Sequence, residues 1–392
     1  VILIISLLTF FIWVFFGGID VVSHGLFAAL SVLVVACPCA VGLATPVALA
    51  AGLNKAARNH ILIRDTSALE QMRNVDVVVF DKTGTLTEGH PTVIGWLWAQ
   101  GQEEHYKDVL LAAESTSDHP LAEAIVTALE GEEQVIPAHL DGFENITGKG
   151  VRVAYQGAEY WVGSHKLLKD YQANLSDILA DMLTQYESDG NSIVYFGREN
   201  DLLAVIAIKD QLRVTSMEAI RELRTQDIEI CMLTGDGERT ASSVAGSLGI
   251  MRFVADAMPD DKEDFIHKLQ LQGKTVAMVG DGVNDAQALS CADVSIAMGK
   301  GTDTLMDTAM ITLRTSDLLL LPKVFRLSRQ TVSLMYRNLF WAFIYNTVGI
   351  FVAAGVLYPV YDILLSPALA GAAMALSCVS VALSSLRLSS RF

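Results

Sequence analysis

Apolar residues are concentrated in four runs, two near each end of the chain. Residues 1–16 are almost wholly apolar, and a second run extends from Leu26 to about Leu53, interrupted by Cys37-Pro38-Cys39. Two further runs cover Leu339–Leu357 and Ile363–Leu386. Because a helix needs about 20 mainly apolar residues to cross a bilayer, we expect four membrane-spanning segments.

Lys and Arg are distributed unevenly around these runs. The segment 17–24 and the segment between the last two runs contain neither. In contrast, Lys55 and Arg58 follow the second run, and a basic stretch from Lys323 to Arg337 precedes the third. The positive-inside rule therefore predicts that the middle of the chain and its C-terminal end face the cytoplasm.

The middle of the chain, residues 76–320, has soluble character and alternates apolar strands with helical stretches. Strands are predicted at Val77–Phe80, Ile228–Leu233 and Thr275–Val279, and this alternation is typical of a parallel, doubly wound α/β sheet. Residues 88–201 interrupt the pattern with helices and short strands of their own. We interpret the apolar run Leu202–Ile208 as the strand with which the parallel sheet resumes.

Composition narrows the possible functions. With 392 residues the chain is long enough for two or three domains, and 52% hydrophobic residues is high for a soluble protein. A net charge of −16 argues against nucleic acid as a partner. The five cysteines show no secreted disulfide pattern, so a reduced cytosolic face is expected. The apolar start lacks a basic segment and a cleavage site, which favours a fragment beginning inside a membrane helix over a signal peptide.

Asp81 directly follows the first predicted strand, in the run Asp81-Lys82-Thr83-Gly84-Thr85-Leu86-Thr87. Ligands of open α/β sheets collect at the carboxyl ends of the strands, and an aspartate there can attack a phosphoryl group and hold it as an acyl phosphate. A capping aspartate in an ordinary turn is the alternative for Asp81 alone.

The residues after two later strands, together with one lysine, could also bind a phosphoryl group or its metal ion. Thr234-Gly235-Asp236 offers a hydroxyl and amides for phosphoryl oxygens. Lys262 can supply positive charge to such an oxygen. Gly280-Asp281-Gly282-Val283-Asn284-Asp285 gathers hard oxygen ligands that suit Mg²⁺. Together, in this order, these motifs indicate phosphoryl transfer, which depends on positioning and charge neutralisation.

The run from Asp81 to Thr87 resembles the phosphorylation motif of the P-type ATPases, and the surrounding sheet resembles the haloacid-dehalogenase-like fold. Many hydrolases of that fold carry a second aspartate two residues after the nucleophile, where this chain has Thr83. A site without that acid should form a phosphoenzyme and release it slowly, as a pump requires. The catalytic residues that the resemblance implies are Asp81, Lys82, Thr83, Thr234, Gly235, Asp236 and Lys262. The Mg²⁺ ligands that it implies are Asp81, the Thr83 main-chain carbonyl, Asp281, Asn284 and Asp285.

Asp210 and Arg213 also match family positions near the phosphorylation site, although a surface ion pair explains them nearly as well. Residues 88–201 resemble the nucleotide-binding domain of heavy-metal ATPases. The resemblance assigns ATP to Glu114, to His119 in Ser117-Asp118-His119-Pro120, and to Gly148, Gly150 and Gly163. The family often has Asn where this chain has Ser164.

Cys37-Pro38-Cys39 interrupts a membrane segment. Proline breaks the helix there, so carbonyl groups and both thiols can face an interior site. Thiolates select soft ions, Cu(I) above all, although Zn²⁺ also accepts them. The last two segments carry Tyr345-Asn346, Met374 and Cys378, with no Lys, Asp or Glu inside their apolar stretches.

These residues resemble the copper(I)/silver subgroup rather than the zinc, cadmium and lead pumps, which place a lysine and an aspartate there. The implied Cu(I) ligands are Cys37, Cys39, Tyr345, Asn346, Met374 and Cys378. The copper pattern usually has Ser where this chain has Cys378, so that thiol either joins the site or fills space.

The resemblance covers essentially the whole chain. It implies two membrane helices with Cys-Pro-Cys in 1–53, a stalk and the start of the phosphorylation domain in 54–87, a nucleotide-binding domain in 88–201, the rest of the phosphorylation domain in 202–320, and two more membrane helices in 321–392. It also implies that the actuator domain lies outside this chain, so the fragment should bind ATP without completing a transport cycle.

The expected function is ATP-driven export of Cu(I), with Ag(I) as a further cargo, using Mg²⁺ and an aspartyl phosphate. The resemblance further implies a bacterial inner membrane with cytoplasmic soluble domains, and a cytosolic copper chaperone as donor. The alternatives are a zinc/cadmium-type pump, a non-transporting metal sensor, and a membrane-tethered phosphatase.

Overall fold

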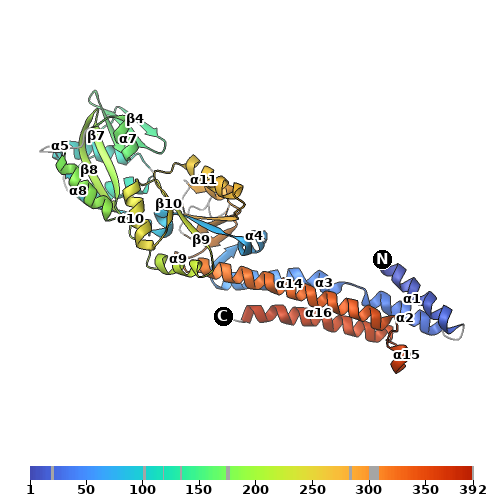
Figure 1. Cartoon of the computed structure of the whole chain (residues 1–392). Helices are drawn as coiled ribbons and strands as arrows, with labels where there is room; N and C mark the ends of the chain where they lie inside the picture. The colour runs from blue at the N-terminus through green and yellow to red at the C-terminus, as the bar shows by residue number, and fades with distance from the viewer. Residues whose placement is uncertain are drawn as a thin grey trace. The chain divides into compact units, whose positions relative to one another are not determined.

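The computed structural model describes residues 1–18, 22–99, 103–117, 119–132, 135–173, 177–281, 285–299 and 309–390 (Figure 1). They divide into two compact units, of which one comprises Val1–Arg73 with Val324–Phe392 and the other Asn74–Lys323. Asp118 and Asn284, two residues of the predicted sites, lie outside the described residues.

The first unit is helical. Its main helices are α1 (Ile2–Gly17), α2 (Val22–Val35), α3 (Cys39–Arg58), most of α14 (Leu320–Ala353) and α16 (Pro367–Ser390), and its short elements are β1 (Ile61–Ile63), α4 (Ser67–Gln71), η2 (Met72–Asn74) and α15 (Tyr358–Tyr361). α1 packs on α2, and α16 packs on both α2 and α3 (Figure 1). The break between α2 and α3 falls at Pro38, which lacks the amide hydrogen needed to continue a helix.

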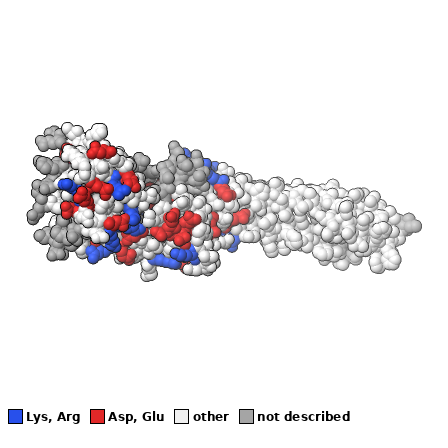
Figure 2. Space-filling view, turned by 90° about the horizontal axis from the view of Figure 1, so that it is seen from above, with Lys and Arg blue, Asp and Glu red and all other residues white. Residues whose placement is uncertain are grey.

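Apolar side chains cover the outside of these helices. By length and hydropathy, the stretches Val22–Arg58 and Pro367–Leu388 are long and apolar enough to cross a membrane, and Ile2–Phe16 is a shorter apolar helix. Phe343 and Leu376 are each 69% exposed. In the view of Figure 2 a long stretch of this unit shows no charged side chain, whereas Lys, Arg, Asp and Glu are frequent on the rest of the surface shown. An apolar exterior of this kind is expected of helices surrounded by lipid.

α14 is longer than the predicted segment Leu339–Leu357. It has 34 residues and includes the basic stretch that precedes the apolar run. At 1.5 Å per residue its length is about 50 Å, more than the roughly 30 Å of a bilayer core. The helix therefore continues beyond the apolar run that the hydropathy pattern marks.

The second unit contains a parallel sheet. Its strands, in spatial order, are β13 (Ile311–Leu313), β12 (Val294–Met298), β11 (Val276–Gly280), β2 (Val77–Asp81), β9 (Glu229–Leu233) and β10 (Arg252–Val254). All of these neighbours pair in parallel. The accompanying helices are α9 (Ser216–Arg224), α10 (Glu238–Leu248), α11 (Pro259–Leu271) and α12 (Ala286–Cys291). Every residue of β2 and β11 is buried, so both faces of the sheet are covered, as in doubly wound folds. The predicted α/β class is confirmed.

An antiparallel sheet is inserted after β2. Its strands, in spatial order, are β3 (Thr92–Trp98), β8 (Asp201–Lys209), β7 (Ser192–Arg198), β6 (Ala158–Gly163), β5 (Gly150–Tyr155) and β4 (Gly142–Ile146). Its helices are α5 (Glu103–Glu114), α6 (Pro120–Glu130), α7 (His165–Asp170) and α8 (Asp177–Ser188).

The interpretation of Leu202–Ile208 as a strand of the parallel sheet is wrong. These residues form β8, which pairs antiparallel with β3 and β7 in the inserted sheet. The run is continuously apolar because the strand is covered on both faces: Ala204, Ile206 and Ile208 enter one cluster, and Val205, between them, enters the other. A central antiparallel strand that is buried on both faces has the same pattern as a parallel strand.

Candidate active site

Asp81 lies at the carboxyl end of β2, in the middle of the parallel sheet. Its register partner on β9 is Leu233, and the preceding Phe80 pairs with Val279 on β11. Thr234 and Asp281 therefore follow the ends of the two strands that flank the Asp81 strand. Sequence-distant side chains meet at the edge of the sheet where ligands of open α/β folds bind.

The loop that follows this aspartate, η3 (Lys82–Leu86), is a tight turn. Gly84 has a φ of 71°, a left-handed conformation. A Cβ at Gly84 would lie 1.5 Å from Oδ2 of Asp281, so only glycine fits beneath this carboxylate. The Gly84 amide donates to Oγ1 of Thr87 (2.9 Å), which closes the turn.

A short segment after β8 holds this loop in place. Asp210 accepts a hydrogen bond from the Thr87 hydroxyl (2.5 Å). Arg213 is only 8% exposed. Its guanidinium donates to the carbonyl oxygens of Gly84 and Thr85, the second at 3.0 Å. The Ser216 hydroxyl donates to a third at 2.7 Å. Arg213 is thus part of the loop's support rather than half of a surface pair, and Ser216 is a residue that sequence reasoning missed.

Lys262, in the first turn of α11, points at the Asp81 carboxylate. Its Nζ lies 2.6 Å from Asp81 Oδ1 and 2.7 Å from Asp285 Oδ1, and none of the three side chains is more than 9% exposed. Burial by itself lowers the pKa of a lysine, but the two carboxylates outweigh this effect and raise the pKa of Lys262. A positive charge is therefore fixed beside Asp81.

Asp81, Asp281 and Asp285 form a cluster whose carboxylate oxygens lie within 4.8 Å of one another. Burial, together with the negative charges of Asp81 and Asp285, raises the pKa of Asp281 to about 7. Lys262 pairs with Asp81 and Asp285 only, so the cluster holds more negative than positive charge, and hard oxygen donors of this kind suit Mg²⁺. The residues present fit a divalent cation. Thr83 has an extended backbone (φ −74°, ψ 128°), and its carbonyl remains a predicted ligand.

Lys82 points away from Asp81 and forms an ion pair with Asp236. Burial by itself raises the pKa of Asp236, but the Lys82 charge outweighs it and holds this pKa below its usual range. Thr234 donates to the same carboxylate (3.1 Å), and the Ser192 hydroxyl donates to its other oxygen (2.9 Å). Ser192, at the start of β7, also accepts from Lys82 Nζ (3.1 Å) and so connects the two sheets. No motif marks it in the sequence. Gly235 lies between Thr234 and Asp236.

The predicted nucleotide residues lie on the inserted sheet and its helices. Glu114 ends α5, which packs on β5 and β6. It is 6% exposed, and burial raises its pKa to about 7. His119 caps α6, and its Nδ1 accepts from the Leu121 amide at 3.2 Å. The helix cap is a structural role that His119 fulfils without any ligand.

The structure also explains why glycine occupies the three predicted positions. Gly150 and Gly163 face each other across β5 and β6. A Cβ at Gly150 would lie 2.1 Å from the Val162 carbonyl oxygen on β6, and one at Gly163 would lie 2.2 Å from the carbonyl oxygen of Lys149, just before β5. Gly148 adopts a φ of 69°. Next to them the Ser164 hydroxyl is buried and has no hydrogen-bond partner among the described residues. An unpartnered hydroxyl beside a strip without side chains fits a polar ligand such as a nucleotide.

The Cys37-Pro38-Cys39 turn joins α2 to α3. Both thiols are free and exposed, with their Sγ atoms 2.6 Å apart. Just beyond the turn, Ala40 and Ala44 of α3 pack in one cluster with Ala342 of α14 and Cys378 of α16. The three helices that carry the predicted metal ligands therefore meet next to the turn.

On α16, the predicted ligands share a face with Gly371. The Cβ position of Gly371 lies 3.9 Å from Val34, near the end of α2. Met374 and Cys378 come three and seven residues later, which places them on the same face. The side of α16 that bears Met374 thus points toward the helices that flank the Cys-Pro-Cys turn.

On α14, the two predicted ligands face different ways. Gly349 approaches Val35, the last residue of α2. Asn346 lies three residues earlier on that face, and its buried Oδ1 has no hydrogen-bond partner among the described residues. Tyr345 is 49% exposed and stacks on Trp341. The structure brings Asn346 toward the turn and leaves Tyr345 on the outside of the helix.

The parallel sheet with a carboxylate at the end of its central strand, a lysine beside it and an acidic cluster after the next strand defines a phosphotransferase of the haloacid dehalogenase type. The chain belongs to the haloacid dehalogenase-like hydrolase family, which matches residues 75–293.

More particular relatives match nearly the whole chain. A copper-exporting P-type ATPase of Legionella pneumophila is 43% identical over 99% of this chain and 52% of its own length. A silver exporting P-type ATPase of Salmonella typhimurium is 44% identical over 99% of this chain and 47% of its own. A crystal structure of a zinc-transporting PIB-type ATPase in the E2.Pi state matches with a TM-score of 0.70 and 32% identity, covering 99% of this chain and 62% of that one.

The predicted resemblance to heavy-metal P-type ATPases is confirmed by these relatives. The chain spans about half the length of the curated relatives it matches.

Proposed function

We propose that this chain is the ATP-hydrolysing and ion-binding part of a Cu(I) exporter that works through an aspartyl phosphate. The observation that carries the proposal is the position of Asp81 at the end of β2, with Lys262 Nζ at 2.6 Å and the acidic cluster beside it. The copper- and silver-exporting relatives support the choice of cargo, and Ag(I) is a second ion with the same soft chemistry.

The geometry suggests which atom reacts. Lys262 holds Oδ1 of Asp81, which leaves Oδ2 to attack the γ-phosphorus of ATP. The new bond joins Oδ2 to phosphorus, and the bond from phosphorus to the ADP oxygen breaks as the electron pair leaves with ADP. Lys262 neutralises charge on the transferred group, and Mg²⁺ held by Asp81, Asp281 and Asp285 would supply further neutralisation.

The phosphoenzyme should persist because Thr83 stands where a related hydrolase carries its general acid/base. The loop that contains Thr83 is fixed by Asp210, Arg213 and Ser216. A long-lived acyl phosphate gives time for a conformational step at the ion site.

We further propose that Cys37, Cys39 and Met374 bind the cargo, with Asn346 and Cys378 nearby. Two free thiols and a thioether suit a soft monovalent ion, and the apolar stretches of α14 and α16 contain no Lys, Asp or Glu, the residues that a divalent ion would favour. Residues 92–209, the inserted sheet with its helices, are proposed to bind ATP. The membrane is proposed to be a bacterial inner membrane with the soluble unit in the cytoplasm, and the donor a cytosolic copper chaperone.

The test is acid-stable labelling of the chain from γ-labelled ATP in the presence of Mg²⁺. Asp81→Asn should abolish the label, whereas Asp76→Asn, on the segment just before β2, should keep it. Labelling that persists in Asp81→Asn would remove Asp81 as the nucleophile. Comparing Cu(I), Ag(I) and Zn²⁺ as stimulators of turnover in the complete protein would separate the copper pump from a divalent-metal pump.

A further inference from the structure

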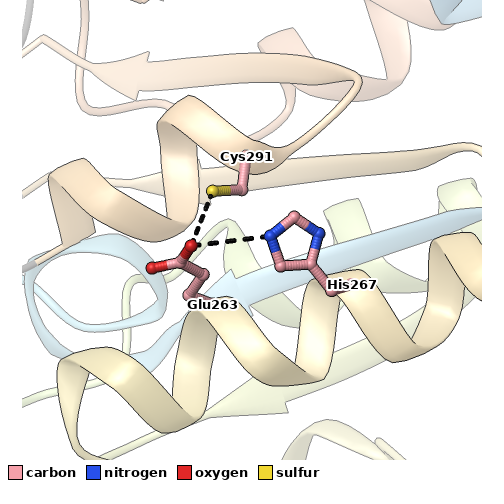
Figure 3. A group of neighbouring side chains, drawn as sticks. All are labelled: Glu263, His267 and Cys291. Carbon is pink, nitrogen blue, oxygen red and sulfur yellow. Dashed lines mark hydrogen bonds and ion pairs between the residues drawn. The ribbon is translucent and has the colours of Figure 1, made fainter.

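A group of three metal-binding side chains lies away from Asp81, on the surface formed by α11 and α12. Glu263 and His267 are one helical turn apart on α11, and Cys291 ends α12. Figure 3 shows the three side chains pointing toward one another. Nothing in the phosphoryl-transfer chemistry uses them.

We propose that Glu263, His267 and Cys291 form a binding site for a borderline divalent ion of the Zn²⁺ type. The Cys291 Sγ lies 3.4 Å from Glu263 Oε1, and His267 Nε2 lies 3.5 Å from the same oxygen. A tetrahedral Zn²⁺ with bonds of about 2.0–2.3 Å separates its ligand atoms by roughly 3.5 Å. The spacing already present therefore matches that of a bound ion.

The second nitrogen of His267 is also held as a metal site requires. Gln270 directs its amide nitrogen at two oxygens, the Cys291 carbonyl (2.9 Å) and an Asp293 carboxylate oxygen (3.2 Å). Its Oε1 consequently faces His267 Nδ1 at 3.2 Å, so Nδ1 carries the hydrogen and donates it. In the neutral ring Nε2 then offers a lone pair toward Glu263 and Cys291. Orientation of a ligand histidine through its other nitrogen is the usual arrangement around protein-bound metals.

The donor set decides the class of ion. One nitrogen, one sulfur and one carboxylate oxygen suit Zn²⁺, which accepts all three. Mg²⁺ prefers oxygen ligands, and Cu(I) prefers soft sulfur donors of which this group supplies one. The three ligands leave a fourth position for water. The thiol hydrogen now bonded to Glu263 would leave to solvent when the thiolate binds the ion.

The position of the site couples it to the phosphorylation residues. Glu263 is next to Lys262 on α11, and α12 directly follows Asp285. An ion bound here would tie together the two helices that position Lys262 and Asp285 around Asp81. Binding does not require phosphorylation, so the site stands or falls independently of the proposed pump activity.

Co²⁺ is the probe for the test, because a cobalt–thiolate bond gives a charge-transfer absorption band and oxygen-only sites do not. The full chain would carry Cys37→Ser, Cys39→Ser and Cys378→Ser, which leaves Cys291 and the fully buried Cys231. We expect a thiolate band on adding Co²⁺, and its loss on adding Zn²⁺. The band should be absent from the same chain with Cys291→Ser.

The remaining variants test the other ligands. His267→Gln and Glu263→Gln should each weaken Zn²⁺ binding at least tenfold, and Gln270→Leu should weaken it roughly 10- to 100-fold through the ring orientation. His139→Gln, at an exposed histidine of the inserted domain, is the matched control and should bind as before. Zn²⁺ should also raise the melting temperature of the chain, and not that of the Cys291→Ser chain.

Two results would overturn the proposal. One is a thiolate band that survives in Cys291→Ser, which would assign it to Cys231. The other is Zn²⁺ affinity unchanged in His267→Gln, which would reduce the group to a lone surface thiol. His267 is exposed, so its substitution should leave the fold intact, and the melting temperature without Zn²⁺ checks this.

Discussion

Gly84→Ala is expected to disable the acidic cluster although none of the three aspartates is itself substituted. The added methyl group would sit 1.5 Å from Asp281 Oδ2 and 2.2 Å from its Cγ. The loop cannot yield easily, because Arg213 and Ser216 hold its carbonyl groups. The Asp281 carboxylate must therefore leave its present place in the cluster.

The magnitude follows from two separate costs. An L-residue at positive φ costs about 1–2 kcal/mol, and forcing a methyl group into a packed site costs about 1–3 kcal/mol more. Gly157→Ala is the matched control, because Gly157 has a φ of 78° but nothing within 4 Å of its Cβ position. Both variants carry the strain of an L-residue at positive φ, but only Gly84→Ala displaces the Asp281 carboxylate. The second cost corresponds to a loss of roughly 5- to 150-fold in the affinity for Mg²⁺.

The assay is the Mg²⁺ concentration that gives half-maximal phosphoenzyme formation. We expect it to rise by roughly 5- to 150-fold in Gly84→Ala, while Gly157→Ala keeps the wild-type value. Equal Mg²⁺ dependence in the two variants would refute the placement of Asp281 against the loop.

Two further predictions concern buried charges. Lys262→Met should lower the stability of the soluble unit by about 3–5 kcal/mol, because it removes the cation that pairs with the buried Asp81 and Asp285. Mg²⁺ should raise the melting temperature of this variant more than that of the wild type. An equal rise in the two chains would contradict the prediction. Burial raises the pKa of Glu114 to about 7, so the folded state should lose up to about 3 kcal/mol as pH rises from about 4.5 to about 7, and none below that window. Glu114→Gln should remove this loss. If the melting temperatures of the two chains change with pH in the same way across that range, the prediction is wrong.

The sequence predicts well which side chains meet at the carboxyl edge of the parallel sheet, because this edge depends on local signals. Apolar strands that end in polar motifs imply a parallel sheet, and the sheet brings Asp81, Thr234 and Asp281 together whatever the connections between them. The assignment of Leu202–Ile208 failed for the converse reason. The partner of a strand is a long-range property, and a run that is buried on both faces does not reveal it.

The supports of the site were also hidden from the sequence. Ser192 and Ser216 belong to no motif in the sequence. Their roles depend on tertiary contacts, with Asp236 and with the Leu86 carbonyl respectively. Tyr345 shows the opposite limit. It is adjacent to Asn346 in a motif, but neighbouring residues on a helix point about 100° apart, so one of the two faces the Cys-Pro-Cys turn and the other does not.

Three groups of proposed ligands in this chain differ in chemical hardness, and this difference would keep apart the ions proposed for them. The acidic cluster offers only carboxylate oxygens, which are ligands for hard cations such as Mg²⁺. The Cys-Pro-Cys turn offers sulfur in an apolar unit, where a hydrated divalent ion loses more on dehydration than a soft monovalent one. The group on α11 and α12 mixes nitrogen, oxygen and sulfur and lies between these extremes. The proposed Cu(I) pump needs such a separation, since copper bound at the acidic cluster would block the Asp81 carboxylate that is proposed to accept the phosphate.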